Sequence, residues 1–101
     1  LKITNDPIVA VKGANVLYTD VWSSMGEENQ KEDKDKDFLG FTIDHNLVKN
    51  ADKDAIILHC LPAYRNKEIT DEIIDSDRSR IFEQAENRMH AQQALLSCIL
   101  C

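Results

Sequence analysis

Apolar and polar positions divide the chain into short strand-like segments separated by helical ones. Residues 1–4, 15–21 and 55–60 are predominantly apolar and are predicted to be strands. The second and third contain continuous apolar runs, which are typical of strands covered on both faces in a parallel sheet. The pattern therefore predicts an α/β domain with three layers and a Rossmann-like parallel sheet.

Helix start signals lie between these segments. Asp6 and Pro7 predict an N-cap followed by proline in the first turn, with Gly13 ending that helix. Thr42 and Thr70 are the expected caps of two further short helices. Three strands make a narrow sheet, and the chain begins inside a predicted strand without an initiator Met. We therefore expect a truncated chain, with more strands upstream in a longer parent protein.

A long helix over about residues 80–100 shows the clearest periodicity and ends the chain. Arg88 lies within its apolar stripe, and since a guanidinium does not lose its proton, this side chain must reach solvent or an anion. His90 projects to the opposite side and is predicted to be a solvated surface residue. The stripe consists of Ile81, Phe82, Ala85, Met89, Leu95, Leu96 and Ile99.

Composition narrows the classes of partner. The formal net charge of −6 and the pI of about 4.9 argue against nucleic acid or an anionic membrane as a partner. No apolar run approaches the ~20 residues of a membrane helix. Residues 27–37 hold six acidic side chains and three lysines, and are predicted to be a solvated loop or part of a lid over a ligand.

The three cysteines are expected to be reduced thiols of an intracellular protein. Cys98 and Cys101 form a C-x-x-C pair at the end of an apolar helix. Redox versions of that motif lie at a helix N-terminus, so a helix tail is a better interpretation than a redox or metal site. No metal ion or organic cofactor is predicted.

Two chemically suggestive segments follow predicted strands, at the edge where open α/β sheets bind ligands. Asp20 is either a turn former or a carboxylate that holds an ammonium group, and Ser24 follows on a turn eased by Gly26. Cys60 is either an inert buried thiol or a site residue. Neighbouring strand residues point to opposite sides, so we do not expect Cys60 and His59 to form a nucleophile–base pair.

Three motifs resemble those of ornithine carbamoyltransferases, a branch of the aspartate/ornithine carbamoyltransferase family. They are D-V-W-S-S-M-G at residues 20–26, H-C-L-P-A at 59–63 and E-N-R-M-H-A-Q at 86–92. Their order and spacing agree with the family along nearly the whole chain. The resemblance implies carbamoyl transfer from carbamoyl phosphate to the δ-amino group of L-ornithine, giving L-citrulline and phosphate in arginine metabolism, without a cofactor.

The resemblance also implies roles for site residues. Asp20 would hold the α-amino group of ornithine, with Ser24 and Met25 positioning the amino acid head. Cys60 would lie near the δ-amino group and, with Asp20, would favour the neutral amine that attacks the carbamoyl carbon. Asp20 and Cys60 are therefore the expected catalytic pair.

Carbamoyl phosphate would be bound by Cys60, Leu61 and Arg88. The family's S-x-R-T and H-P-x-Q motifs do not occur in this sequence. We therefore expect residues 1–101 to be a partial ornithine-binding domain that lacks the N-terminal carbamoyl phosphate domain and is inactive alone. The apolar stripe around Arg88 would then be partly exposed.

The family also implies an assembly and a location. The parent enzyme is expected to be a homotrimer or a multiple of trimers, and to be cytoplasmic, with the mitochondrial matrix as the alternative if a transit peptide lies upstream. Two other interpretations stay open: a non-catalytic α/β module that binds an amino acid or assembles with a partner, and a carbamoyltransferase for a related amine. An upstream S-x-R-T would argue against the module, while Asp20, Ser24 and Met25 argue against an amine without an amino acid head.

Overall fold

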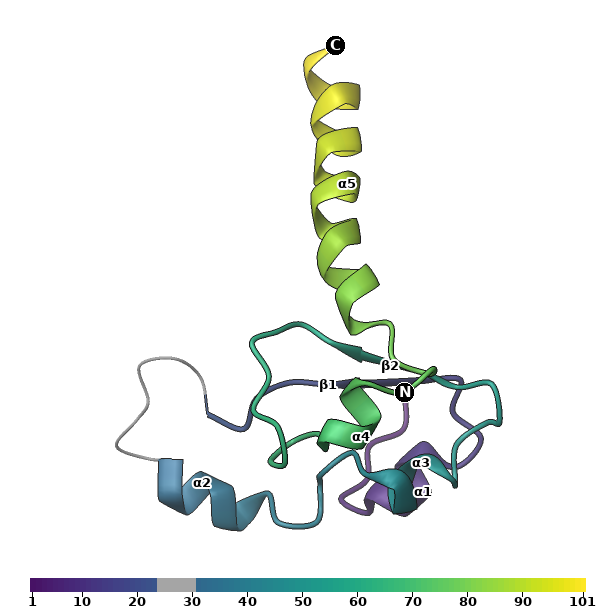
Figure 1. Ribbon diagram of the computed structural model, residues 1–101, viewed down its shortest axis with the longest axis vertical. Coiled ribbons are helices and arrows are strands. Elements are labelled where there is room, and N and C mark those ends of the chain that lie inside the picture. The colour runs from purple at the N-terminus through teal and green to yellow at the C-terminus, as the bar shows by residue number, and fades with distance from the viewer. Residues whose placement is uncertain (24–30) are drawn as a thin grey trace.

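The computed structural model describes residues 1–23 and 31–101 and shows an α/β arrangement. Helices α1 and α3 lie beneath the two strands in Figure 1, and α5 rises from the opposite side. Helices thus lie on both sides of the sheet, as the sequence predicts. In chain order the elements are α1 (Pro7–Val11), β1 (Val16–Thr19), α2 (Lys31–Asp37), α3 (His45–Val48), β2 (Ile56–His59), α4 (Asp71–Ile74) and α5 (Ile81–Leu100).

Strands β1 and β2 pair in parallel, with a register that runs from Val16 opposite Ile56 to Thr19 opposite His59. The segment before α5 extends this pairing: the Ile57 N–H donates to the Arg78 carbonyl at 3.0 Å, and the Arg80 N–H donates to the Ile57 carbonyl at 2.9 Å. The two predicted strands and their parallel pairing are therefore confirmed, but coverage of both faces is wrong for β1, because Val16 and Tyr18 on its outer face are exposed. Their carboxyl ends lie side by side.

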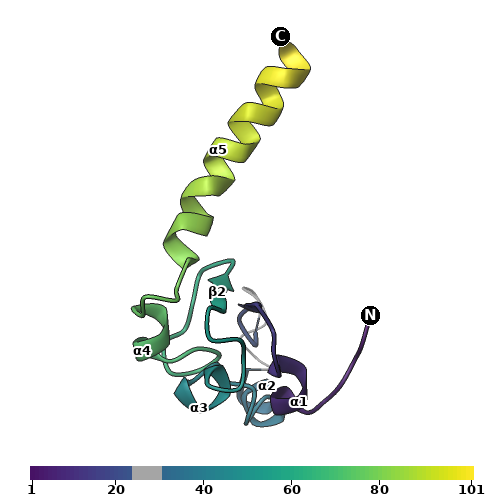
Figure 2. The same ribbon diagram turned by 90° about the vertical axis from the view of Figure 1, so that its right-hand side faces the viewer.

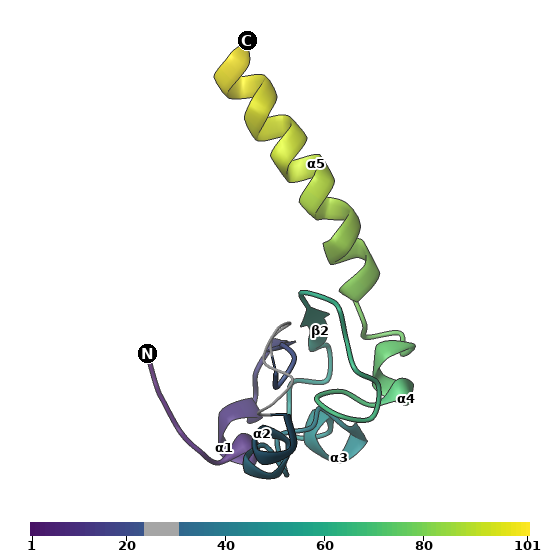
Figure 3. The ribbon, with the colours of Figure 1, turned by 90° about the vertical axis from the view of Figure 1, so that its left-hand side faces the viewer.

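The predicted strand at residues 1–4 is wrong. This segment has no strand conformation, and Leu1 and Ile3 are among the most exposed apolar residues. Figures 2 and 3 show it running away from the sheet. A strand needs a neighbour to satisfy its backbone N–H and C=O groups, and within the described residues no such neighbour pairs with this segment.

Two of the expected helix caps are found and one is replaced. Asp6 caps α1, its Oδ1 accepting the Ile8 N–H at 2.9 Å. Thr70 is the N-cap of α4, although its side chain makes no capping hydrogen bond. Thr42 does not cap α3; its hydroxyl donates instead to the Lys67 carbonyl at 2.6 Å. Asp44 is the cap, and its carboxylate accepts the Leu47 N–H at 2.8 Å.

The acidic segment is partly helical, so the prediction of a solvated loop is wrong over α2. Lys and Glu are good helix formers, and Lys34 and Lys36 lie in the last turn, where the helix dipole favours cations. The rest of this acidic segment, residues 27–30, lies outside the described residues. Lys67 joins α2 to the loop after β2 through an ion pair with Asp35.

The core lies between α1, α3, α4 and the sheet, and α5 enters it only at its first residue. Ile81 is fully buried, whereas Met89 and Ile99 are 60% and 68% exposed. The apolar stripe of α5 is therefore open along most of its length, as expected. None of the described helices combines the length and hydropathy needed to cross a bilayer. The core cluster consists of Val11, Leu17, Ile43, Leu47, Val48, Ile57, Ile69, Ile73, Ile74 and Ile81.

Candidate active site

The paired strands bring Asp20 and Cys60 together. Thr19 and His59 are the last partners in the parallel register, so the residues that follow them leave the same edge of the sheet. There the chain forms a pocket of about 310 Å³, in the position where open α/β sheets bind ligands. Its lining residues are Asp20, Val21, Ser23, Cys60, Leu61, Pro62, Tyr64 and Arg88.

Asp20 is held as a carboxylate. The Cys60 thiol donates a hydrogen bond to it, and this bond is the main reason why the pKa of Asp20 is lowered. The Val21 N–H donates to Asp20 Oδ1 at 2.7 Å and lowers the pKa further. Asp20 is thus an anionic acceptor at the edge of the pocket, suited to an ammonium group.

Cys60 is held as a neutral thiol. Burial raises its pKa, and the hydrogen bond to the Asp20 carboxylate and the charge of that carboxylate raise it further. The charge of Arg88 acts in the opposite direction and lowers this pKa. Because the thiolate is the nucleophilic form of cysteine, this arrangement favours a hydrogen-bonding role over covalent chemistry at Cys60.

Leu61 has a left-handed backbone, with a φ of 58°, and a cis peptide bond joins it to Pro62. A positive φ at a branched residue costs about 1–3 kcal/mol and requires support from the surrounding structure. That support comes from the preceding histidine: the Leu61 N–H donates to His59 Nδ1 at 2.8 Å. The backbone next to Cys60 is therefore fixed at the pocket edge.

His59 is buried away from the pocket, with its side chain closed to solvent. Its Nε2 lies 3.0 Å from Glu68 Oε1, which also accepts the Tyr64 N–H at 2.7 Å. His59 therefore supports the loop and does not pair with the Cys60 thiol, as the strand alternation predicts. Glu68 and Tyr64 were not singled out from the sequence, because only the folded loop brings them to His59.

Arg65 stabilises the far side of the same loop. Its guanidinium donates to Asp71 at 2.8 Å and to Asp75 at 2.7 Å. These contacts tie the loop to α4 and leave Arg65 engaged outside the pocket. Asp75 accordingly has a lowered pKa.

Arg88 approaches the pocket from α5. It is exposed, lines the pocket beside Cys60, and its charge reaches the thiol. This guanidinium interrupts the apolar stripe of α5, and the structure gives it a neighbouring pocket. An anion bound there would supply the partner that a guanidinium needs.

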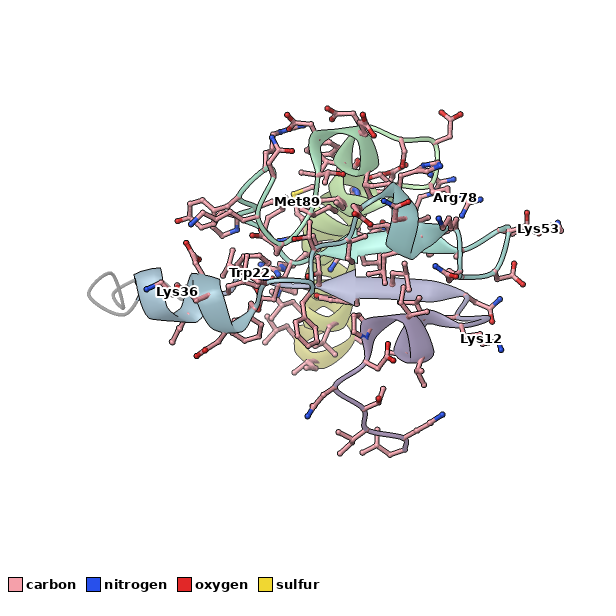
Figure 4. All side chains as sticks on the ribbon, turned by 90° about the horizontal axis from the view of Figure 1, so that it is seen from below. Lys12, Trp22, Lys36, Lys53, Arg78 and Met89 are labelled. Carbon is pink, nitrogen blue, oxygen red and sulfur yellow. The ribbon has the colours of Figure 1, made fainter. Side chains whose placement is uncertain are left out.

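Two predicted ornithine contacts, Ser24 and Met25, lie outside the described residues. The segment leading toward them is anchored by an aromatic contact, since Trp22 stacks on Phe38 with ring centroids 6.0 Å apart. Phe41 meets Phe38 edge to face at 6.2 Å. Figure 4 shows Trp22 between the end of β1 and α2, at the opposite end of the strands from Lys12 and Lys53.

Metal-ligand side chains do not gather in the described part of the chain: residues 1–23 and 31–101 contain no group of three or more His, Cys, Asp or Glu side chains suited to a metal ion. Cys98 and Cys101 are exposed, free thiols at the end of α5.

Comparison with known proteins identifies the family of this domain. Residues 1–99 match the Asp/Orn-binding domain of aspartate/ornithine carbamoyltransferases. The chain is 78% identical over 100 residues to the ornithine carbamoyltransferase of Prochlorococcus marinus subsp. pastoris, an alignment that covers 99% of this chain and 32% of that protein. It thus spans about a third of the length of the curated relatives it matches.

Solved structures agree. The ornithine carbamoyltransferase from Pyrococcus furiosus superposes with a TM-score of 0.84 at 52% identity, covering 91% of this chain and 29% of that one. The anabolic ornithine carbamoyltransferase from Campylobacter jejuni gives a TM-score of 0.85 at 52% identity, covering 94% and 31%. The chain therefore belongs to the aspartate/ornithine carbamoyltransferase family, and its residues 1–99 match the Asp/Orn-binding domain of that family.

Proposed function

We propose that this chain is the ornithine-binding part of an ornithine carbamoyltransferase, which transfers the carbamoyl group of carbamoyl phosphate to the δ-amino group of L-ornithine. The observation that carries the proposal is the meeting of an ionised Asp20 and a protonated Cys60 at the carboxyl ends of two paired strands, with Arg88 facing them. The names of the relatives and solved structures support the same acceptor.

Ornithine carries ammonium groups, and the Asp20 carboxylate binds its α-ammonium group. Ser24 and Met25 position the rest of the amino acid head. Cys60 then lies at the δ-amino group, where an uncharged thiol, unlike a thiolate, does not stabilise the ammonium form. Only the neutral amine has the lone pair that attacks the carbamoyl carbon.

The reaction forms a bond between the δ-nitrogen and the carbamoyl carbon and breaks the bond between that carbon and the phosphate oxygen. Phosphate leaves with the electron pair of the broken bond and accepts the proton that the attacking amine loses, giving citrulline. Cys60 and the fixed backbone of Leu61 contact the carbamoyl group, while Arg88 offsets the negative charge of carbamoyl phosphate. No step requires a metal ion or an organic cofactor.

The proposal extends to the whole protein. We infer that the activity needs the upstream domain, so that the 101-residue chain is inactive alone. A homotrimer or a multiple of trimers would complete the sites and cover the open stripe of α5. The setting is arginine metabolism, in either direction, in the cytoplasm or, if a transit peptide precedes the chain, in the mitochondrial matrix.

A panel of acceptors tests the substrate. The full-length protein is given carbamoyl phosphate with L-ornithine, L-aspartate, N-acetyl-L-ornithine or putrescine, and phosphate release and ureido product are measured together. We expect turnover with ornithine and little with the others: N-acetyl-L-ornithine lacks the free α-ammonium group that Asp20 binds, putrescine lacks the amino acid head, and L-aspartate has no second amine to attack the carbamoyl carbon. Preferred turnover of another acceptor contradicts the ornithine assignment, and turnover of none favours the non-catalytic module.

A further inference from the structure

We propose that Gln84 is a positioning residue, which sets the place of Arg88 relative to Cys60 by bridging the carboxyl ends of β1 and β2. The inference rests on the proposed function for its catalytic meaning. Its geometry is independent of that function.

The side chain of Gln84 uses both of its polar atoms on the sheet. Its Oε1 accepts the backbone N–H of His59 at 3.0 Å, and its Nε2 donates to the Tyr18 hydroxyl at 2.9 Å. His59 directly precedes Cys60, and Tyr18 lies just before Asp20 in the chain. One amide thus contacts the end of each strand that leads into the pocket.

Gln84 is also one of the last residues through which α5 contacts the rest of the domain. Ile81 is buried and the Arg80 N–H donates to the Ile57 carbonyl, but every residue of α5 after Gln84 is exposed. Arg88 follows one helical turn later, on the same face as Gln84. The direction in which the helix carries Arg88 over the pocket therefore depends on this first turn.

The position of Arg88 can be followed through the ionisation of Cys60, because the charge of Arg88 lowers the pKa of the Cys60 thiol. Among the described residues, the other charged or titratable groups around the thiol are Asp20, which follows β1, and, in its own segment, His59 and Tyr64. A substitution at Gln84 does not remove any of these side chains. A change in the ionisation of Cys60 would therefore reflect a moved Arg88 or a moved strand end.

The test measures the rate at which iodoacetamide alkylates Cys60 across the neutral to alkaline range, in the full-length protein, with mass spectrometry of the Cys60 peptide. With Gln84→Ala the profile shifts to higher pH, and the rate near neutral pH falls by about two- to fivefold. Gln93→Ala, which removes an exposed glutamine further along α5, retains the wild-type profile. Thermal unfolding of each variant verifies that it is folded.

A double-mutant cycle separates this role from a general loosening of the helix. Arg88→Met alone shifts the profile in the same direction, and adding Gln84→Ala to Arg88→Met produces no further shift. An unshifted profile in a folded Gln84→Ala protein, or an additive shift in the double variant, overturns the proposal. If Gln84→Ala does not fold, Tyr18→Phe removes one of the two bonds, and we expect a smaller upward shift; an unchanged profile then overturns the proposal.

Alkylation requires neither carbamoyl phosphate nor ornithine. A shifted profile in a protein that makes no citrulline supports the positioning role and contradicts only the proposed function. A normal profile in an active enzyme contradicts only the positioning role.

Discussion

The Nε2 atom of His59 lies 3.0 Å from Oε1 of Glu68, and both side chains are closed to solvent. Since the Leu61 N–H donates to Nδ1, this nitrogen carries no hydrogen, and Nε2–H is the donor to Glu68. One imidazole thus connects the strained backbone beside Cys60 to a carboxylate that also holds Tyr64. The histidine of the H-C-L-P-A motif acts here as a support for the loop.

Removing the carboxylate of Glu68 should be strongly destabilising. Glu68→Ala leaves the His59 Nε2–H buried without its acceptor and also removes the carboxylate that accepts the Tyr64 N–H, and we expect it to lower the free energy of unfolding by about 3–5 kcal/mol. Glu68→Gln retains a carbonyl acceptor and should lower it by about 1–2 kcal/mol. Urea unfolding measures both, with the exposed Glu72→Ala as the matched control. Equal losses for the Ala and Gln variants would contradict this account of the pair.

Substitutions at Asn66 test the backbone conformation of the loop that follows β2. Its φ is 64°, in the left-handed region where Asn is tolerated and Ala is strained. We expect Asn66→Ala to destabilise the protein by about 1 kcal/mol or more, and Asn66→Gly by less, because glycine adopts a positive φ without strain. The two unfolding midpoints provide the comparison. If glycine proves the worse substitution, the strain of a positive φ does not decide the outcome at this position, since both variants lose the contacts of the Asn66 side chain with Asp71 equally.

The ion pair of Arg65 with Asp75 predicts a pH dependence of stability. Arg65 lowers the pKa of Asp75 in the folded protein, so the stabilisation is present above the ordinary pKa of an aspartate and is lost as the pH falls through the lowered value. Asp75→Asn should therefore reduce the melting temperature at neutral pH, and the difference from wild type should disappear in strong acid. Asp77→Asn is the control, since the described part of the structure gives Asp77 no ion pair. A difference that persists unchanged at low pH would refute the prediction.

Asp20→Asn should change reactivity and activity in opposite directions. The Asp20 carboxylate helps to raise the pKa of the Cys60 thiol, so its removal lowers that pKa and increases the thiolate population near neutral pH. We expect faster alkylation of Cys60 by iodoacetamide, together with a loss of citrulline formation of about 100-fold or more, because the ammonium site is gone. Alkylation at an unchanged or slower rate would show that Asp20 does not control the thiol. Asp54→Asn, far from the pocket in an exposed loop, should leave both rates unchanged.

Much of the fold follows from local patterns in the sequence. The continuous apolar runs around Leu17 and Ile57 predict two covered parallel strands, and the topology then brings Asp20 and Cys60 to one edge. The predicted strand at residues 1–4 fails because apolar character does not supply the neighbour that a strand must pair with. The predicted cap of α3 fails for a related reason. Thr42 and Asp44 are both good caps, but the hydroxyl of Thr42 donates to the carbonyl of Lys67, 25 residues away in sequence.

The motifs are short segments of sequence, whereas the contacts that build the site join residues far apart in sequence. Arg88 could be singled out because a cation interrupts an apolar stripe. Gln84 lies one turn earlier and gives a weaker signal, since a polar residue on a half-exposed helix is common. Its two contacts, and those of Glu68, exist only after the sheet, the loop and α5 have come together.

The role of Cys60 and the need for the upstream domain are tested together by citrulline formation from carbamoyl phosphate and ornithine, measured for the full-length protein, for its Cys60→Ala variant and for the 101-residue chain alone. The account predicts an active full-length protein, a strongly weakened Cys60→Ala variant and a silent chain, with Cys98→Ser active as the thiol control. A full-length protein that forms no citrulline, or a Cys60→Ala variant as active as wild type, would contradict it.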